Sequence, residues 1–231
     1  GEAERQSKLL KDAEIKALQA QIHPHFLFNA INTIVALCRT DAALARKALL
    51  NLGTFFRNNL QGARQRLVPL NTEMEHVEAY MALEQIRYPG RYSLEWNIGE
   101  GTGHAMVPPF TLQPLVENAV KHGFKRRRSG GMIRVSIVRD KDFLRVEVAD
   151  NGCGIKEERL KVLGRNEVAS KTGTGTALQN LRERLSGLFG KEAGMSIESD
   201  EKGTCVRLTF PFIERGEHAI DEGLYRRGRA A

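Results

Sequence analysis

The segment Ile22-His-Pro-His-Phe-Leu-Phe-Asn29 contains the residues best suited to nucleophilic chemistry in this chain. An imidazole with an ordinary pKa near 6.5 is largely neutral at pH 7, so it can attack an electrophile. His23 and His25 are two positions apart, and on a helix their side chains would point to opposite sides. They cannot hold one metal ion together, so the segment offers a nucleophile rather than a zinc site.

The neighbours of His25 bear on its reactivity. Asn29 follows at i+4, where its amide can reach the ring and fix its tautomer, although an amide cannot act as a base. Pro24 lacks a backbone N–H and is expected to loosen or bend the helix just before His25. Phe26 occupies the next position, so no acidic residue adjoins the ring. A lone histidine on a helix is usually structural, so its role depends on the rest of the chain.

A second polar cluster lies in Leu115-Val-Glu-Asn-Ala-Val-Lys-His-Gly123. On a helix Asn118 and His122 share one face, and Glu117 and Lys121 share the next. Magnesium is bound by oxygen atoms, often by few protein ligands together with phosphates and water, so Asn118 is a candidate ligand. Taken alone, the strip is equally well explained as the solvated face of an amphipathic helix.

Two glycine-rich segments follow this cluster. Asp150 ends an apolar strand, where its carboxylate can accept a hydrogen bond from an exocyclic amino group, and Gly152 and Gly154 would let the backbone approach a flat base. Further on, Gly173-Thr-Gly175 precedes a helix whose free N–H groups suit phosphate oxygens. Each segment alone could be an ordinary turn, but their fixed order within one region indicates a nucleotide site.

Together these segments resemble the sensor histidine kinases of the LytS/YehU type, and residues 91–213 resemble the GHKL (Bergerat) ATPase fold. The resemblance implies ATP and Mg²⁺ as ligands, with phosphorylation at His25 and not at His23. It implies that Asn118 binds Mg²⁺, that Lys121 and His122 contact phosphate, and that Asp150 receives the adenine amino group. Ala177 stands where relatives often have a third glycine. The remaining cofactor-binding residues implied in this way are Gly152, Gly154, Gly173, Thr174, Gly175, Leu178, Asn180 and Thr204.

The same resemblance leads to a hypothesis about proton transfer. Asn29 would orient His25, and Glu117 would receive the proton once the two regions dock. Phosphoryl transfer otherwise requires mainly in-line positioning and charge neutralisation. Asn29 could also position a water against an aspartyl phosphate, which makes phosphatase activity a secondary expectation.

Hydrophobic periodicity predicts an α+β protein in which an all-helical half precedes a half of mixed strands and helices. The resemblance implies that the second half is a two-layer α/β sandwich. Residues 1–20 are expected to form a signalling helix or coiled coil, residues 21–90 a helical dimerisation and phosphoacceptor domain, residues 91–213 the ATP-binding domain, and residues 214–231 a basic flexible tail. The expected elements are then helices at 41–60, 71–88, 108–120 and 176–188, and strands at 94–98, 133–137, 144–148, 195–199 and 205–210. A hairpin is expected at Asp140-Lys-Asp142.

Composition narrows the class of protein. Hydrophobic residues make up 41% and charged residues 27%, as in ordinary globular domains. The net charge of +7 is densest at Lys125–Arg128, in an expected loop without interleaved aromatic residues, so no nucleic-acid partner is expected. The three cysteines lack disulfide or metal-ligand spacing. No window is apolar enough to span a membrane. The chain lacks an initiator Met, so it is expected to be the cytoplasmic portion of a longer protein whose sensor segment is anchored in the inner membrane.

The leading interpretation is an ATP-dependent protein histidine kinase that forms homodimers and passes its phosphoryl group to an aspartate of a response regulator receiver domain. Three alternatives remain at this point. One is a GHKL ATPase without autokinase activity, or a serine kinase of the anti-sigma type. Another is a binding module that uses ATP only as a conformational clamp. The third is a nucleic-acid binder that uses Lys125–Arg128, which predicts steeply salt-dependent binding.

Overall fold

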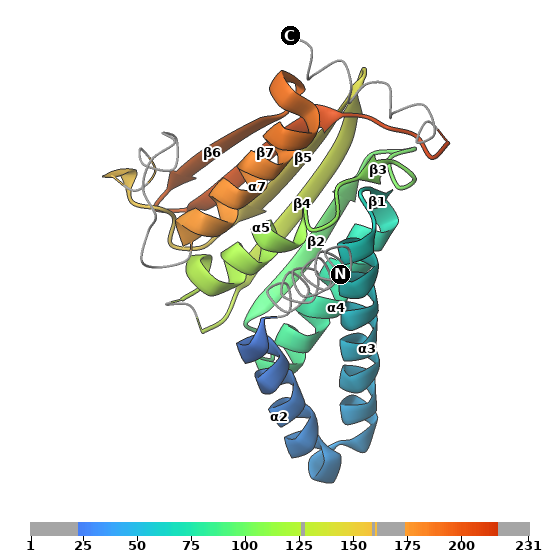
Figure 1. The fold of residues 1–231 in the computed structure, drawn as a ribbon. Helices are drawn as coiled ribbons and strands as arrows, with labels where there is room; N and C mark the ends of the chain where they lie inside the picture. Colours follow the sequence, from blue (N-terminus) through green and yellow to red (C-terminus); the bar gives the residue numbers. More distant parts are fainter. Residues whose placement is uncertain (1–22, 126–127, 159, 161–173, 217–231) are drawn as a thin grey trace, which may run out of the picture.

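The computed structural model describes residues 23–125, 128–158, 160 and 174–216, and gives no side-chain description of residues 174–176 (Figure 1). The expected coiled coil at 1–20, Gly173 and residues 217–231 of the expected tail lie outside the described residues. Within the described part, no helix combines the length and apolar character needed to cross a bilayer.

Three long helices form the N-terminal part, grouped at the bottom of the view in Figure 1. They are α2 (Pro24–Thr40), α3 (Ala42–Arg64) and α4 (Leu70–Arg87). Asp41 caps α3, because its side chain accepts a hydrogen bond from the Leu44 N–H at 2.9 Å. The Phe26 ring packs 4.9 Å from Phe55 and 5.1 Å from Tyr80 between centroids, which joins the three helices in one core.

Pro24 does not bend a helix, contrary to the expectation. It is the first residue of α2, and His23 before it is the N-cap, with an extended backbone (φ −65°, ψ 106°). A proline at this position costs no hydrogen bond, because the first N–H groups of a helix have no partner within it. His25 therefore lies in the first turn of α2 rather than after a kink.

A five-stranded mixed sheet forms the C-terminal part, with the order β2-β4-β5-β7-β6. Its strands are β2 (Tyr92–Ile98), β4 (Gly131–Asp140), β5 (Phe143–Asp150), β6 (Gly194–Asp200) and β7 (Gly203–Pro211). The β2–β4 pair is parallel and the other pairs are antiparallel. The expected β4–β5 hairpin is present, and Lys141 at its turn has a positive φ of 56°.

Helices cover one face of this sheet, as Figure 1 shows for α5 (Gln113–Asn118) and α7 (Thr174–Phe189). On that face Ile133, Val135 and Ile137 are fully buried, while the intervening Arg134 faces solvent. The alternation buries one face only, as the strand periodicity predicts. The predicted fold class, a helical region followed by a two-layer α/β sandwich, is confirmed.

Two local elements differ from the expectation. The helix expected at 108–120 is shorter: α5 begins at Gln113 and, after Asn118, the chain widens into the π-helical turn η1 (Ala119–Gly123). A two-stranded ribbon was not expected at all: β1 (Val68–Pro69) pairs with β3 (Met106–Val107) just before α4 and α5. The 3-10 turn η2 (Gly190–Glu192) completes the described elements.

Glu73 connects α4 to the segment before α5 through hydrogen bonds. Its carboxylate is buried and accepts hydrogen bonds from the N–H groups of Phe110, Thr111 and Leu112 at 2.8, 3.0 and 3.1 Å. From α7, the Arg184 guanidinium donates to the carbonyl oxygens of Pro109 and Phe110. Phe110 has a φ of 59°, which side-chain-bearing residues rarely adopt, and the two charged groups hold it there. Burial raises the pKa of Glu73, while the three N–H groups and Arg184 oppose that shift.

Replacing Glu73 with alanine is expected to lower the free energy of unfolding by about 3 kcal/mol, because three N–H groups would lose a buried acceptor and Arg184 would lose a nearby opposite charge. Urea denaturation measures the loss. Glu75→Ala on the exposed side of α4 serves as the matched control and should change stability by less than about 0.5 kcal/mol. Equal stabilities of the two variants would contradict the role assigned to Glu73.

Candidate nucleotide and phosphoacceptor site

Asp150 lies at the end of β5 with its carboxylate turned toward the following loop. One carboxylate oxygen accepts a hydrogen bond from the Gly152 N–H at 2.8 Å. Burial raises the pKa of Asp150, and backbone hydrogen bonds from Gly152 and Thr204 oppose the shift. A half-buried acceptor at a strand end can receive an amino group, as the sequence suggested.

The two glycines of this loop are needed because neighbouring backbone is very close. A Cβ atom on Gly152 would lie 2.3 Å from the carbonyl oxygen of Gly123. Gly154 has a φ of +71°, and a Cβ there would lie 1.8 Å from the carbonyl oxygen of Asp200. The loop is therefore packed between the end of η1 and the β6–β7 turn. The glycines therefore serve to let this loop pack directly against protein backbone on both sides.

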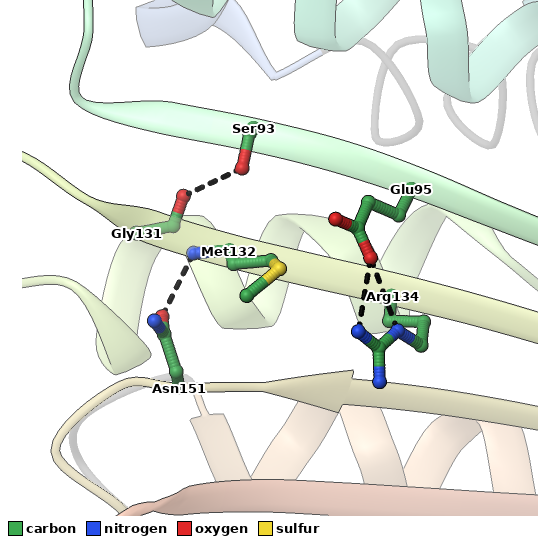
Figure 2. Close-up of polar contacts among 6 residues, drawn as sticks. All are labelled: Ser93, Glu95, Gly131, Met132, Arg134 and Asn151. Carbon is green, nitrogen blue, oxygen red and sulfur yellow. Dashed lines mark hydrogen bonds and ion pairs between the residues drawn. The ribbon is translucent and has the colours of Figure 1, made fainter.

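Asn151 holds this loop in place, although sequence reasoning assigned it no role. Figure 2 shows its Oδ1 accepting a hydrogen bond from the Met132 N–H, at 2.7 Å. Its Nδ2 donates to the Gly130 carbonyl at 3.0 Å, and its own N–H donates to the Met132 carbonyl at 3.2 Å. Asn151 thus connects the loop after β5 to the start of β4. Its position directly after Asp150 is the feature of the sequence that could have indicated this role.

Contacts across the parallel β2–β4 pair secure the same region (Figure 2). The Ser93 hydroxyl donates to the Gly131 carbonyl at 3.4 Å. The Arg134 guanidinium donates twice to one oxygen of Glu95, at 3.0 and 3.1 Å. Both side chains of this ion pair are about half exposed, so the pair adds little stability to the β2–β4 ladder in which Glu95 and Arg134 lie opposite each other.

Thr204 lies on the other side of the Asp150 loop, at the start of β7. Its hydroxyl is 2.8 Å from that of Ser199 on β6, and Ser199 Oγ accepts a hydrogen bond from the Ile155 N–H at 2.6 Å. Ser199 is a second positioning residue that the sequence did not indicate. The predicted Thr204 is therefore at this site, linked to the loop through Ser199.

The predicted polar strip on α5 and η1 ends against the Asp150 loop. The Gly123 carbonyl accepts a hydrogen bond from the Cys153 N–H at 2.8 Å, and the His122 carbonyl lies 3.3 Å from the Cys153 sulfur. Asn118 is half-buried at the junction of α5 and η1, and π-helical turns are frequent at functional sites. The structure therefore brings the strip and the Asp150 loop together.

The residues predicted on α7 are placed less completely. Thr174 and Gly175 begin α7, and Asn180 is exposed on its second turn. Leu178 is 1% exposed and packs in the core, so any contribution to nucleotide binding is through supporting α7.

Glu117 is a buried carboxylate with three partners. Its Oε1 accepts a hydrogen bond from Gln113 Nε2 at 3.0 Å, and its Oε2 lies 2.8 Å from His23 Nε2 and 3.6 Å from Lys121 Nζ. Burial alone would raise the pKa of Glu117, but His23, Gln113 and Lys121 outweigh burial and lower it. The carboxylate is therefore ionised at neutral pH. The sequence suggested that His25 would meet Glu117, but in this arrangement its neighbour is His23.

His25 is exposed in the first turn of α2, and the expected contact with Asn29 is present. Asn29 Nδ2 lies 3.1 Å from His25 Nδ1. An amide can rotate to offer either its nitrogen or its oxygen to a ring nitrogen. As placed, the amide nitrogen faces Nδ1 and donates to it. After a 180° turn of the amide its oxygen accepts from Nδ1–H instead, and the lone pair of Nε2 is then free for attack.

Two family models match the chain. The model described as histidine kinase matches residues 13–92, and the model described as histidine kinase-, DNA gyrase B-, and HSP90-like ATPase matches residues 110–214. Among solved structures, a histidine kinase domain from Erythrobacter litoralis is similar to this chain. The alignment includes 90% of this chain and 94% of that domain, with 17% sequence identity and a TM-score of 0.48.

The curated relatives are proteins named Sensor protein LytS. The protein from Bacillus cereus is 56% identical over 91% of this chain, and the protein from Bacillus subtilis is 54% identical over 94%. A protein from Staphylococcus aureus named Sensor histidine kinase/phosphatase LytS is 50% identical over 94%. The chain spans 36% to 37% of the length of these relatives. The chain therefore belongs to the histidine kinases, with the family's histidine kinase segment at residues 13–92 followed by its ATPase domain at residues 110–214.

Proposed function

We propose that this chain transfers the γ-phosphoryl group of ATP to Nε2 of His25 and then to an aspartate on a response regulator receiver domain. The observation that carries the proposal is the exposed imidazole of His25, held at Nδ1 by Asn29, on a helix whose N-cap contacts the nucleotide-site helix through Glu117. In the first step the Nε2 lone pair forms a bond to the γ-phosphorus, the bond to the β–γ bridging oxygen breaks, and ADP leaves.

The residues proposed to hold ATP come from three places around the Asp150 loop. Asp150 would accept the adenine amino group, Gly152 and Gly154 would keep the loop in the close packing that positions Asp150, and Thr204 would support the base from β7. The N terminus of α7, with Thr174 and Gly175, would face phosphate oxygens, with Leu178 and Asn180 further along the same helix. Gly173, which precedes Thr174 in the sequence, is proposed as a further phosphate-binding residue.

Asn118 is the proposed protein ligand of Mg²⁺, and Lys121 and His122 would contact the phosphates. A bound Mg²⁺ supplies positive charge that offsets the charge developing during phosphoryl transfer. Lys121 is exposed on η1, so its ammonium group would add a positive charge to that of the bound Mg²⁺.

The Nδ1 proton of His25 must leave after the ring is phosphorylated. Asn29 can hold the ring but cannot take the proton, since an amide oxygen is too weak a base. Glu117 is the proposed acceptor, because it is an ionised carboxylate at the contact between α2 and α5.

A second copy of the chain is the proposed partner of the helical part. Phe28, Ile31 and Val35 are 66%, 45% and 64% exposed and recur on one face of α2. An apolar stripe of this kind favours packing against another helix. We propose a homodimer through this region, attached to a membrane-anchored sensor segment outside this sequence and acting on the cytoplasmic side.

Phosphatase activity is a second proposed function, in which Asn29 positions a water against the aspartyl phosphate of the regulator. The contact between Asn29 and His25 at i+4 favours it, and one relative is named as a kinase/phosphatase.

The chemistry of the bond tests the main proposal. Incubation of the chain with γ-labelled ATP and Mg²⁺ should give a labelled protein whose label is lost in acid and retained in alkali, as for a phosphoramidate. A label that survives acid, or ATP hydrolysis without any protein label, would contradict autophosphorylation on histidine.

A further inference from the structure

His23 forms a direct contact between the phosphoacceptor helix and the nucleotide-site helix. Its Nε2 lies 2.8 Å from Oε2 of Glu117. His23 is the N-cap of α2, and Glu117 lies on α5 immediately before Asn118. The contact therefore connects the first turn of α2, which carries His25, to the helix that carries the proposed magnesium ligand.

The environment of Glu117 makes this contact stronger than an ordinary surface pair. The Glu117 side chain is 11% exposed and that of His23 is 45% exposed. A buried carboxylate is costly unless its oxygens are paired, and removing one partner leaves an under-satisfied charge. Besides His23, the groups that act on Glu117 are Gln113 on α5, Lys121 on η1, and His76, Tyr80 and Glu84 on α4.

His25 lies between two fixed points of α2. On one side His23 is held by Glu117, and on the other side Phe26 is buried against Phe55 and Tyr80. The His25 ring itself is exposed, and Asn29 is its contact on α2. The position of the His25 ring relative to α5 is therefore set by the residues on either side of it.

We propose that His23 is a positioning residue for the phosphorylation of His25. Through its bond to Glu117 it fixes the start of α2 against α5, so that the exposed His25 ring is presented to the phosphates held beside Asn118. His23 does not itself carry the phosphoryl group. The inference rests on the proposed kinase function.

The test compares initial rates of labelling and the KM for ATP in the whole chain. His23→Ala should lower kcat about tenfold, since small displacements of a reacting group cost one to two orders of magnitude, and should leave the KM for ATP within about twofold. His23→Gln should recover most of the rate, because its carboxamide N–H can still donate to Glu117. The matched control is His104→Ala, an exposed histidine outside the site, which should behave as the parent chain.

A double-mutant comparison ties the effect to the contact itself. In a Glu117→Gln background, His23→Ala should lower the remaining rate less than about twofold, because the pair is already weakened. Circular dichroism and ATP binding of each variant test whether the fold is retained. The double-mutant comparison is repeated with His23→Gln, which changes the start of α2 least.

Several results would overturn the inference. The first is an unchanged kcat in His23→Ala, and the second is a rise in its KM for ATP as large as the fall in its kcat. The third is an effect of His23→Ala that is as large in the Glu117→Gln background as in the parent chain. The fourth is faster labelling of His23→Ala, which would mean that His23 shields Glu117. Failure of the kinase proposal looks different, because the parent chain itself would then carry no acid-labile label.

Discussion

Replacing His25 with glutamine should reduce autophosphorylation about a thousandfold or more, because a carboxamide has no nucleophilic lone pair to replace that of the imidazole. Glutamine is similar in size to histidine and the position is exposed, so the fold and ATP binding should be unaffected. Incorporation of labelled phosphate, together with equilibrium binding of ATP, separates the loss of the acceptor from a loss of the nucleotide.

His23→Gln is the matched control for this prediction, because it makes the same chemical change two residues earlier. It should retain most of the parent rate, whereas His25→Gln retains none that can be measured. Loss of label in the His23 variant and its persistence in the His25 variant would mean that the acceptor has been assigned to the wrong ring.

Gly152→Ala should weaken ATP binding about a hundredfold or more. The new methyl group would lie 2.3 Å from the carbonyl oxygen of Gly123, which is backbone and cannot move aside as a side chain would. Either the Asp150 loop or the end of η1 must shift, and the residues proposed to bind adenine and phosphate lie on these two segments. A factor of one hundred corresponds to about 2.7 kcal/mol of binding free energy.

Gly187→Ala on α7 is the control for the same chemical change. Nothing lies within 4 Å of a Cβ atom at this exposed helical position, so ATP affinity should be unchanged and stability should rise slightly. Parent-like ATP affinity in Gly152→Ala, measured by calorimetry on folded protein, would contradict the placement of the base beside this loop.

Periodicity predicted the long elements well. The helix expected at 71–88 is α4 at Leu70–Arg87, and the alternating residues of β4 and β5 lie in the strands and on the buried face that they indicated. These elements depend on spacing within one segment, which the sequence displays directly. The expected domain boundary near residue 90 stays a prediction. Contacts do cross that position, because α4 packs on α3 and its Glu73 also binds the segment before α5.

The elements that were missed depend on partners distant in the chain. In the sequence Glu73 looks like an ordinary helical glutamate. Only the fold brings it to residues 110–112, whose N–H groups bind its carboxylate, and α5 begins after them rather than at residue 108. Pro24 was expected to bend a helix because its position relative to the helix start was unknown. The contact of His23 with Glu117 likewise requires α2 to lie against α5. The residue types of the candidate site could be predicted, but not which histidine would meet Glu117.

The position of the phosphoryl group on the chain is the most direct test of the central claim. Peptides from labelled protein, handled in alkali and fragmented in a mass spectrometer, include the segment with both His23 and His25. The phosphoryl group is expected on His25 alone. Finding it on His23, or on any residue outside this segment, would contradict the proposal that the ATPase domain phosphorylates the exposed ring held by Asn29.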